Sequence, residues 1–92
     1  MLFTSDVLAG LTEGVEAYEL GDYATSTKEQ RPLADQGNAD AQFFMGLMYN
    51  SSHGVAPDHG RAVEWWGHAA AQGHVRAEYS LGHMYQEDNG NA

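Results

Sequence analysis

The chain has 92 residues, a length that suits one small domain and excludes an elaborate two-domain enzyme. Thirteen acidic residues against four basic ones give a formal net charge of -9, which disfavours nucleic-acid or anionic membrane partners. The absence of cysteine excludes disulfides, thiol catalysis and cysteine-ligated metal.

The first part of the chain predicts two helices. In the stretch 5–20, apolar side chains recur every three or four residues, at Val7, Leu11, Val15 and Tyr18. A second helix is expected over 23–35, with Asp22 as its N-cap and Gly37 as the glycine that closes it. Pro32 has no backbone N–H and therefore predicts a kink or a break in this helix.

The rest of the chain predicts three more helices, over 39–51, 59–72 and 75–87. Asp58 is the expected N-cap of the middle helix, and Gly73 is the glycine that closes it. The segment 51–58 is expected to form a loop, in which Gly54 and Pro57 are turn residues.

An internal repeat relates these helices. Residues 22–49 align with residues 58–85 at a shift of 36 positions without a gap, and eight of the 28 aligned positions are identical. The identical pairs are Asp22/Asp58, Ala34/Ala70, Gln36/Gln72, Gly37/Gly73, Ala41/Ala77, Gly46/Gly82, Met48/Met84 and Tyr49/Tyr85. Helices repeated at a fixed period predict an all-α fold, a short α-solenoid of antiparallel helix pairs with about five helices.

One repeated pair, Gly46 and Gly82, falls in the middle of a helix, where glycine costs about 1 kcal/mol relative to alanine. Its recurrence at the same repeat position predicts that two helices approach closely at each of these glycines.

The chain resembles the Sel-1-like repeat family, a branch of the tetratricopeptide-like α-solenoids. The resemblance is carried by the segment ADAQFFMGLMYNSSHGVAPDHGRAVEWWGHAAAQGHVRAEYSLGHMY, which includes the short motifs HGV and AAAQGH. The resemblance implies that the α-solenoid is right-handed and forms a single domain over 1–92. Its expected parts are a tetratricopeptide-like helix pair at 5–37, a complete repeat at 38–73, the first helix of an incomplete repeat at 74–87 and a polar tail at 88–92.

Some positions depart from the family's pattern. In the helix at 23–35, three polar residues stand where the second repeat has more apolar ones. They are Ser26, Thr27 and Gln30, against Ala62, Val63 and Trp66. This difference predicts weaker packing of the first helix pair. Gly60 and Gly67 are each expected to weaken the helix at 59–72 by about 1 kcal/mol.

Five histidines raise the question of a metal site or of acid–base catalysis. They stand at 53, 59, 68, 74 and 83, and no two are separated by three or four residues, so HxxxH and HExxH pairs are absent. Glu64 and His68 have the spacing of an exposed helical contact. The chain also lacks a GxSxG elbow and a phosphate-binding glycine motif. We expect no enzyme activity, cofactor or metal, and a zinc site assembled only by folding is the alternative left open.

The sequence leaves the cellular compartment undetermined. It has no apolar run near the about 20 residues of a membrane span and no signal-peptide pattern. A cytoplasmic chain is expected from the sequence as it stands, or a periplasmic or secreted one if a signal peptide has been removed.

The resemblance implies a concave groove lined by the first helix of each pair. Its expected residues are Asp40, Phe43, Leu47, Asn50, Arg76, Tyr79, His83 and Gln86. Such a surface combines aromatic anchors with polar groups, as peptide-binding grooves require. Phe43 and Tyr79 have an alternative role, which is to fill the space between helices. Phe44 is either an additional core contact or an exposed anchor, and the adjacent pair Trp65 and Trp66 is expected in the core.

The family's members are mostly protein-binding adaptors, so the resemblance implies a bacterial adaptor or scaffold that binds a protein or peptide through its concave face without catalysis. The acidic charge favours a basic or hydrophobic-basic partner. An inhibitor or immunity-type protein for a bacterial toxin is one alternative. A self-associating unit is another, because Leu81, Met84 and Tyr85 lack a covering helix at the incomplete end.

Overall fold

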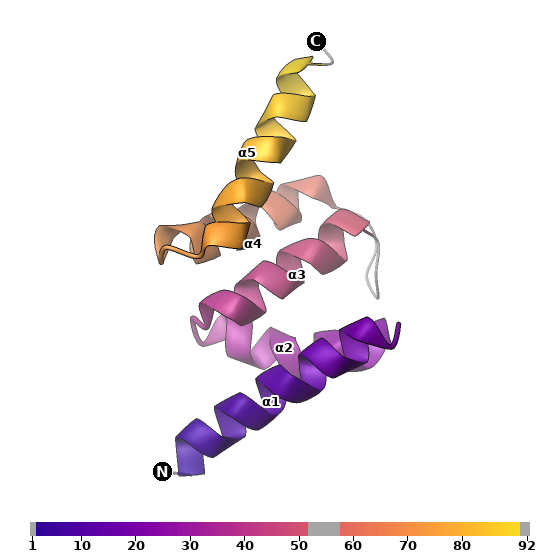
Figure 1. Ribbon diagram of the computed structural model, residues 1–92, viewed down its shortest axis with the longest axis vertical. Helices are drawn as coiled ribbons and strands as arrows, with labels where there is room; N and C mark the ends of the chain where they lie inside the picture. Colours follow the sequence, from indigo (N-terminus) through magenta and orange to yellow (C-terminus); the bar gives the residue numbers. More distant parts are fainter. Residues whose placement is uncertain (1, 52–57, 91–92) are drawn as a thin grey trace.

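The computed structural model describes the backbone of residues 2–51 and 58–90, and the side chains of residues 10–51 and 58–86. These residues form five α-helices (Figure 1). They are α1 (Leu2–Glu19), α2 (Tyr23–Asp35), α3 (Ala39–Ser51), α4 (His59–Ala71) and α5 (Val75–Gly90). The five predicted helices are confirmed, although α1 begins before residue 5 and α5 extends beyond residue 87. The expected turn residues Gly54 and Pro57 lie outside the described residues.

The helices are stacked in chain order. Each helix packs against the next, and successive helices run back and forth across the stack, with the two ends of the chain at its opposite ends (Figure 1). The molecule is accordingly elongated, with extents of 49 × 26 × 18 Å. This arrangement is the predicted α-solenoid, in which each helix buries its apolar side against its neighbours.

Two helices begin at the predicted aspartate caps. Asp22 Oδ1 accepts a hydrogen bond from the Thr25 N–H at 3.2 Å, and Asp58 Oδ1 accepts one from the Arg61 N–H at 3.0 Å. Hydrogen bonds from Thr25, first from its side chain and then from its backbone, hold the pKa of Asp22 below its usual value. Both N-cap predictions are confirmed.

Helices α1, α2 and α4 each end in a glycine with left-handed backbone geometry. The φ angles are 83° at Gly21, 98° at Gly37 and 84° at Gly73. After α2, the Gly37 N–H donates to the Ala34 carbonyl and the Asn38 N–H donates to the Leu33 carbonyl, both at 3.0 Å. These two bonds form a Schellman motif, which confirms the predicted helix-closing role of Gly37.

Pro32 does not break α2, so the prediction of a break is wrong. The helix continues through Pro32 to Asp35, and the Pro32 carbonyl still accepts a hydrogen bond from the Gln36 N–H at 3.1 Å. The proline lies in the last turn, where its missing N–H removes a single bond close to the helix end.

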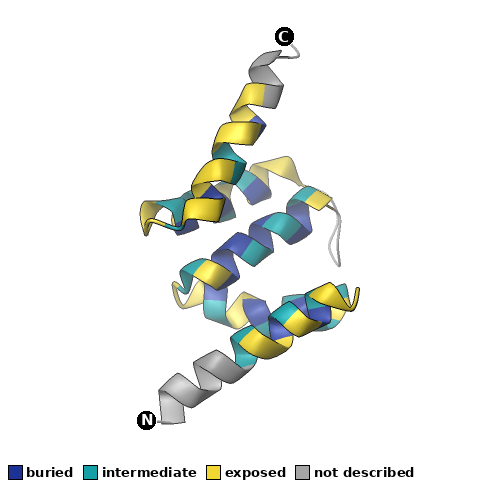
Figure 2. Ribbon diagram, in the orientation of Figure 1, coloured by how far each residue is buried: buried dark blue, intermediate teal, exposed yellow. Residues whose placement is uncertain are grey.

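The core follows the contact between α3 and α4. Figure 2 shows burial concentrated on α3 and on the inner sides of α2 and α4, whereas much of α5 is exposed. The core cluster comprises Ala34, Ala41, Phe43, Met45, Tyr49, Ala62, Trp66, Ala69, Ala77 and Met84.

The expectation that the apolar residues of α5 lack a cover is wrong for one of the three. Met84 is only 8% exposed, because the face of α5 that packs on α4 carries it into the core. Leu81 is partly buried against the same cluster, whereas Tyr85 is 53% exposed. Tyr85 is thus the residue of this set that the rest of the described chain leaves open.

The close helix approach predicted at Gly46 is confirmed, and the one predicted at Gly82 is wrong. The Trp66 indole of α4 lies against Gly46, where it would overlap a Cβ atom, and its Nε1–H donates to the Phe43 carbonyl at 3.1 Å. A Cβ atom on Gly82 would meet nothing within 4 Å among the described residues. The two glycines differ because α4 lies over α3, while no described helix lies over this side of α5.

The first helix pair repeats the glycine contact with polar residues. Gln30, which stands 36 positions before Trp66, packs on Gly14 of α1. Ser26 and Gln30 are both fully buried; the Ser26 hydroxyl donates to the Gly14 carbonyl at 2.7 Å and accepts from Gln30 Nε2 at 3.1 Å. Gln30 Oε1 is buried without a hydrogen-bond partner. The polar residues therefore form part of the α1–α2 interface, at the cost of one unpaired carbonyl oxygen.

Candidate functional site

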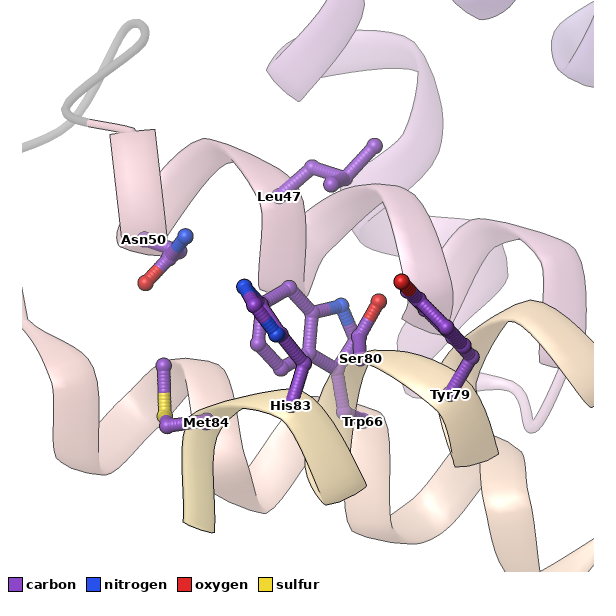
Figure 3. Close-up of a pocket in the computed structure, with 7 residues that line it drawn as sticks. All are labelled: Leu47, Asn50, Trp66, Tyr79, Ser80, His83 and Met84. Atoms are coloured by element: carbon purple, nitrogen blue, oxygen red, sulfur yellow. The ribbon is translucent and has the colours of Figure 1, made fainter. Parts of the chain in front are cut away.

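The residues predicted for the groove come together where α3 faces α5. A hollow of about 150 Å³ opens between the two helices. Figure 3 shows its lining residues, which are Leu47 and Asn50 from α3, Trp66 from α4, and Tyr79, Ser80, His83 and Met84 from α5. We call this set the α3–α5 groove. It includes four of the eight predicted residues.

Two broader depressions continue the groove over the neighbouring surface. One, of about 510 Å³, brings in Phe43 and Arg76, and the other, of about 430 Å³, brings in Gly82 and Gln86. Tyr79 lines all three hollows. Of the predicted residues, Asp40 alone lines none of these three.

The groove has an apolar floor and a polar rim. Trp66 and Met84, which are 3% and 8% exposed, form the floor. On the rim, the rings of Tyr79 and His83 are nearly parallel, with an interplanar angle of 11° and a centroid distance of 6.1 Å. Figure 3 shows these rings on α5, with Leu47 and Asn50 on α3. The arrangement combines apolar contact area with hydrogen-bonding groups, as in a site that binds a peptide.

Phe43 and Tyr79 occupy the same repeat position but have different environments. Phe43 is 3% exposed, with the His74 ring stacked on it at 4.9 Å and the Arg76 guanidinium 4.7 Å from its ring centre. Tyr79 is 74% exposed. The space-filling role is therefore correct for Phe43 and wrong for Tyr79, because the described chain has no helix that covers Tyr79.

Asp40 lies beside the start of α5 and contacts His74. Asp40 Oδ1 is 2.9 Å from His74 Nε2, and His74 Nδ1 accepts the Ala77 N–H at 3.2 Å. Because Nδ1 is the acceptor, the neutral tautomer carries its proton on Nε2 and donates to Asp40. His74 thus caps α5 and ties it to the start of α3.

The sequence reasoning missed this capping role of His74. Asn38, the residue 36 positions earlier, caps α3 in the same way, since its Oδ1 accepts the Ala41 N–H at 3.0 Å. Both residues directly follow a helix-closing glycine. That position, occupied twice by a side chain able to accept a hydrogen bond, was the available signal.

Phe44 belongs to an aromatic cluster that includes α1. Its ring is 5.5 Å from those of Phe43 and Tyr18, and it is partly buried against the core. Of the two roles left open, the structure therefore shows the core contact. Burial raises the pKa of Tyr18; neighbouring Tyr23 adds to the increase and Arg76 opposes it.

The two adjacent tryptophans have different surroundings. Trp66 is buried, as predicted. Trp65 is partly buried against the core, and its ring also faces the Arg31 guanidinium at 5.8 Å and the His68 ring at 6.2 Å. Trp65 lines a shallow hollow of about 130 Å³ on the exposed side of α4 together with Arg61, Glu64 and His68. This second surface is separate from the α3–α5 groove in its lining residues.

Among the described residues, no three histidine, aspartate or glutamate side chains lie in an arrangement that could hold a metal ion. His53 is outside the described residues. None of the described helices combines the length and apolar character needed to cross a membrane.

Comparison with known protein families identifies the repeats. Residues 39–74 and 75–90, which together make up more than half of the chain, match the Sel1 repeat. The chain belongs to the Sel1 repeat family. Sel1 repeats generally mediate protein–protein interaction, and the family is a non-catalytic interaction module. A comparison with curated proteins found no match.

Proposed function

We propose that this Sel1 repeat chain is a non-catalytic adaptor that binds a protein or peptide segment in the α3–α5 groove. The observation that carries the proposal is an apolar floor bordered by exposed Tyr79 and by the polar groups of Asn50 and His83. Tyrosine offers a large contact area together with a hydroxyl, a combination common at binding sites. The interaction role of the family agrees with this use of the surface.

The partner that suits this groove is basic or hydrophobic-basic. The chain has a net charge of -9, which attracts a cationic segment over a distance that salt shortens. The face of the exposed Tyr79 ring also suits a lysine or arginine side chain. Association is therefore expected to weaken as ionic strength rises.

The test compares a groove variant with a matched surface variant in pull-downs. Tyr79→Ala combined with His83→Ala removes two rim side chains that are exposed, so the fold is expected to survive. Glu64→Gln combined with His68→Ala alters the exposed side of α4 and is the control. A protein that the unmodified chain captures is expected to be captured by the control variant and lost by the groove variant. The circular dichroism of the groove variant is expected to stay unchanged. Identical partners for both variants and the unmodified chain would contradict the groove assignment.

Self-association is the second candidate function, and exposed Tyr85 is the observation that favours it. A homodimer that covers Tyr85 and the partly buried Leu81 would give twice the chain mass in light scattering. Tyr85→Ser is expected to return such a dimer to a monomer. A monomer at high protein concentration before any substitution rules this candidate out.

A further inference from the structure

An apolar stripe is exposed along α5. Large hydrophobic residues exposed among the described side chains are Leu20, Val75, Tyr79 and Tyr85, and the last three lie on this helix. Tyr79 and Tyr85 stand three residues before and after Gly82, and Val75 stands seven residues before it. At 3.6 residues per turn, all three point within about 60° of the direction of Gly82. With Glu78 and Gln86, four residues from the glycine on either side, they form what we call the α5 stripe.

The same positions of the preceding repeat are covered. They are Ala39, Gln42, Phe43, Gly46, Tyr49 and Asn50, each 36 residues before its counterpart in the α5 stripe. Gln42, Phe43, Gly46 and Tyr49 are buried. Residues from Arg61 to Gln72, at and around α4, cover Gln42, Gly46 and Tyr49. The Phe43 ring is covered by His74 and Arg76. The structure thus contains one occupied and one open copy of the same surface.

Three contacts define how the occupied copy is covered. Trp66 lies on Gly46 and donates its indole N–H to the Phe43 carbonyl. Six residues later, Gln72 Nε2 donates to Gln42 Oε1 at 2.9 Å. Five residues before Trp66, the Arg61 guanidinium lies 5.8 Å from the Tyr49 ring centre.

The packing between these contacts is made by small side chains. Ala62 and Ala69, four residues before and three residues after Trp66, are both fully buried. The covering helix therefore carries a cation, a small residue, a tryptophan, a small residue and an amide at fixed spacing. On α5, Gly82 has nothing within 4 Å of a Cβ position, so the seat for an indole is open.

We propose that the α5 stripe binds a basic amphipathic helix from another protein, with a tryptophan seated on Gly82. Relative to this tryptophan, the partner helix has a cation at -5 over Tyr85, small residues at -4 and +3, and a lysine, arginine or glutamine at +6 beside Glu78. A cation is favoured at +6 because Glu78 replaces the neutral Gln42, and because the chain carries a net charge of -9. This surface is additional to the α3–α5 groove of the proposed function, with which it shares Tyr79.

The test uses the chain's own α4 sequence as the probe helix. The peptide covers residues 58–73 with Gln72→Lys, which supplies the cation at +6, and with His68→Lys, whose new side chain is joined to Glu64 by a lactam that holds the peptide helical on its exposed side. Binding to the full chain is measured by fluorescence anisotropy of the labelled peptide. We expect saturable 1:1 binding, which is lost when the peptide also carries Trp66→Ala. Absence of saturable binding by the intact peptide contradicts the proposal.

Gly82→Ala in the full chain is the decisive variant, because it adds one methyl group at the seat of the indole. We expect at least a tenfold weaker affinity for the peptide together with an unchanged or higher melting temperature, since alanine favours the helix. Gly67→Ala is the matched control, a helical glycine that also has nothing within 4 Å, and it is expected to leave binding unchanged. Equal affinity of the Gly82→Ala chain and the unmodified chain overturns the proposal.

Two further measurements separate this surface from the alternatives. Asn50→Ala changes the rim of the α3–α5 groove on α3, outside the α5 stripe, and peptide binding is expected to survive it, so the proposed function and this inference can fail independently. Light scattering of the chain alone tests a second copy as the occupant. A dimer that Gly82→Ala dissociates would assign the stripe to self-association and overturn the partner helix.

Discussion

At the scale of single residues, the environment of a side chain in this protein depends on which helix lies over it. Gly46 and Gly82 share a repeat position, yet Trp66 packs on the first and no described residue packs on the second. Phe43 and Tyr79 show the same contrast, at 3% and 74% exposure. The residue type at a repeat position therefore reflects the repeat pattern, and its energetic role depends on the neighbouring helix.

Substitution at Gly46 measures the energetic value of this contact. Gly46→Ala is expected to lower the free energy of unfolding by about 1–3 kcal/mol, because its Cβ would overlap the Trp66 indole. Gly67→Ala, at an open helical position, is expected to raise it by about 1 kcal/mol. Urea unfolding of both variants measures whether the free energy of unfolding falls for Gly46→Ala and rises for Gly67→Ala. Stabilisation by both substitutions would show that the Trp66 side chain can move to make room for the added methyl group at little energetic cost.

At the scale of helix pairs, α1–α2 and α3–α4 each place a side chain of the second helix on a glycine of the first, but the residue types differ. The connection between α1 and α2 comprises residues 20–22, four fewer than the residues 52–58 between α3 and α4. Gln30 accordingly meets Gly14, 16 positions before it, whereas Trp66 meets Gly46, 20 positions before it. At this contact the first pair has a buried glutamine and the second pair has an indole.

The unpaired oxygen of Gln30 predicts that the α1–α2 interface can be stabilised. Gln30→Met is expected to raise the free energy of unfolding by about 1 kcal/mol, since it removes a buried acceptor without a partner and keeps the side-chain volume. Ser26 retains its bond to the Gly14 carbonyl. The measurement is chemical unfolding followed by circular dichroism.

Gln42 provides the control, because it is a buried glutamine with both ends of its amide bonded. Its Nε2 donates to the Ala34 carbonyl at 3.2 Å and its Oε1 accepts from Gln72. Gln42→Met is expected to lower the free energy of unfolding by about 1 kcal/mol, since it removes both hydrogen bonds of the Gln42 amide. The two partners keep one bond each, because the Ala34 carbonyl still accepts the Gly37 N–H and Gln72 Nε2 still donates to the Gly37 carbonyl. If the two methionine variants shift stability in the same direction, the role assigned to the unpaired Gln30 oxygen is wrong.

At the scale of the whole molecule, stability is expected to be greatest in the middle of the stack. Most of the core cluster comes from α3 and α4, whereas among the described side chains of α1 the partly buried Leu11 is the one that packs against it. In a solenoid each helix is stabilised mainly by its neighbours, so a helix with one neighbour opens more readily than a helix with two.

Hydrogen exchange tests this gradient. Backbone amides of α3 and α4 are expected to exchange most slowly, and those of α1 at least tenfold faster, because α1 can separate from α2 without disturbing the core. The readout is mass spectrometry on peptides from each helix. Equal protection in α1 and α3 would indicate that the stack unfolds as one cooperative unit.

Much of the fold could be predicted because its signals are local. The aspartates before α2 and α4 act on the first turn of each helix, and the glycines after them act on the last turn. The 36-residue repeat is found by aligning the sequence with itself. The break expected at Pro32 was wrong because the cost of proline depends on its distance from the helix end. The cap formed by His74 was missed because histidine is an uncommon cap, although Asn38 marks the same position.

By itself, the sequence determined the five helices, their ends and the repeat that stacks them, since these depend on backbone hydrogen bonds and on spacing along the chain. The tertiary structure alone decided which copies of a repeated position are covered. Met84 is buried in the core, Tyr79 and Tyr85 are exposed, and no described residue packs on Gly82. Burial depends on neighbours distant in sequence, and identical residues are buried or exposed according to whether another helix lies on them.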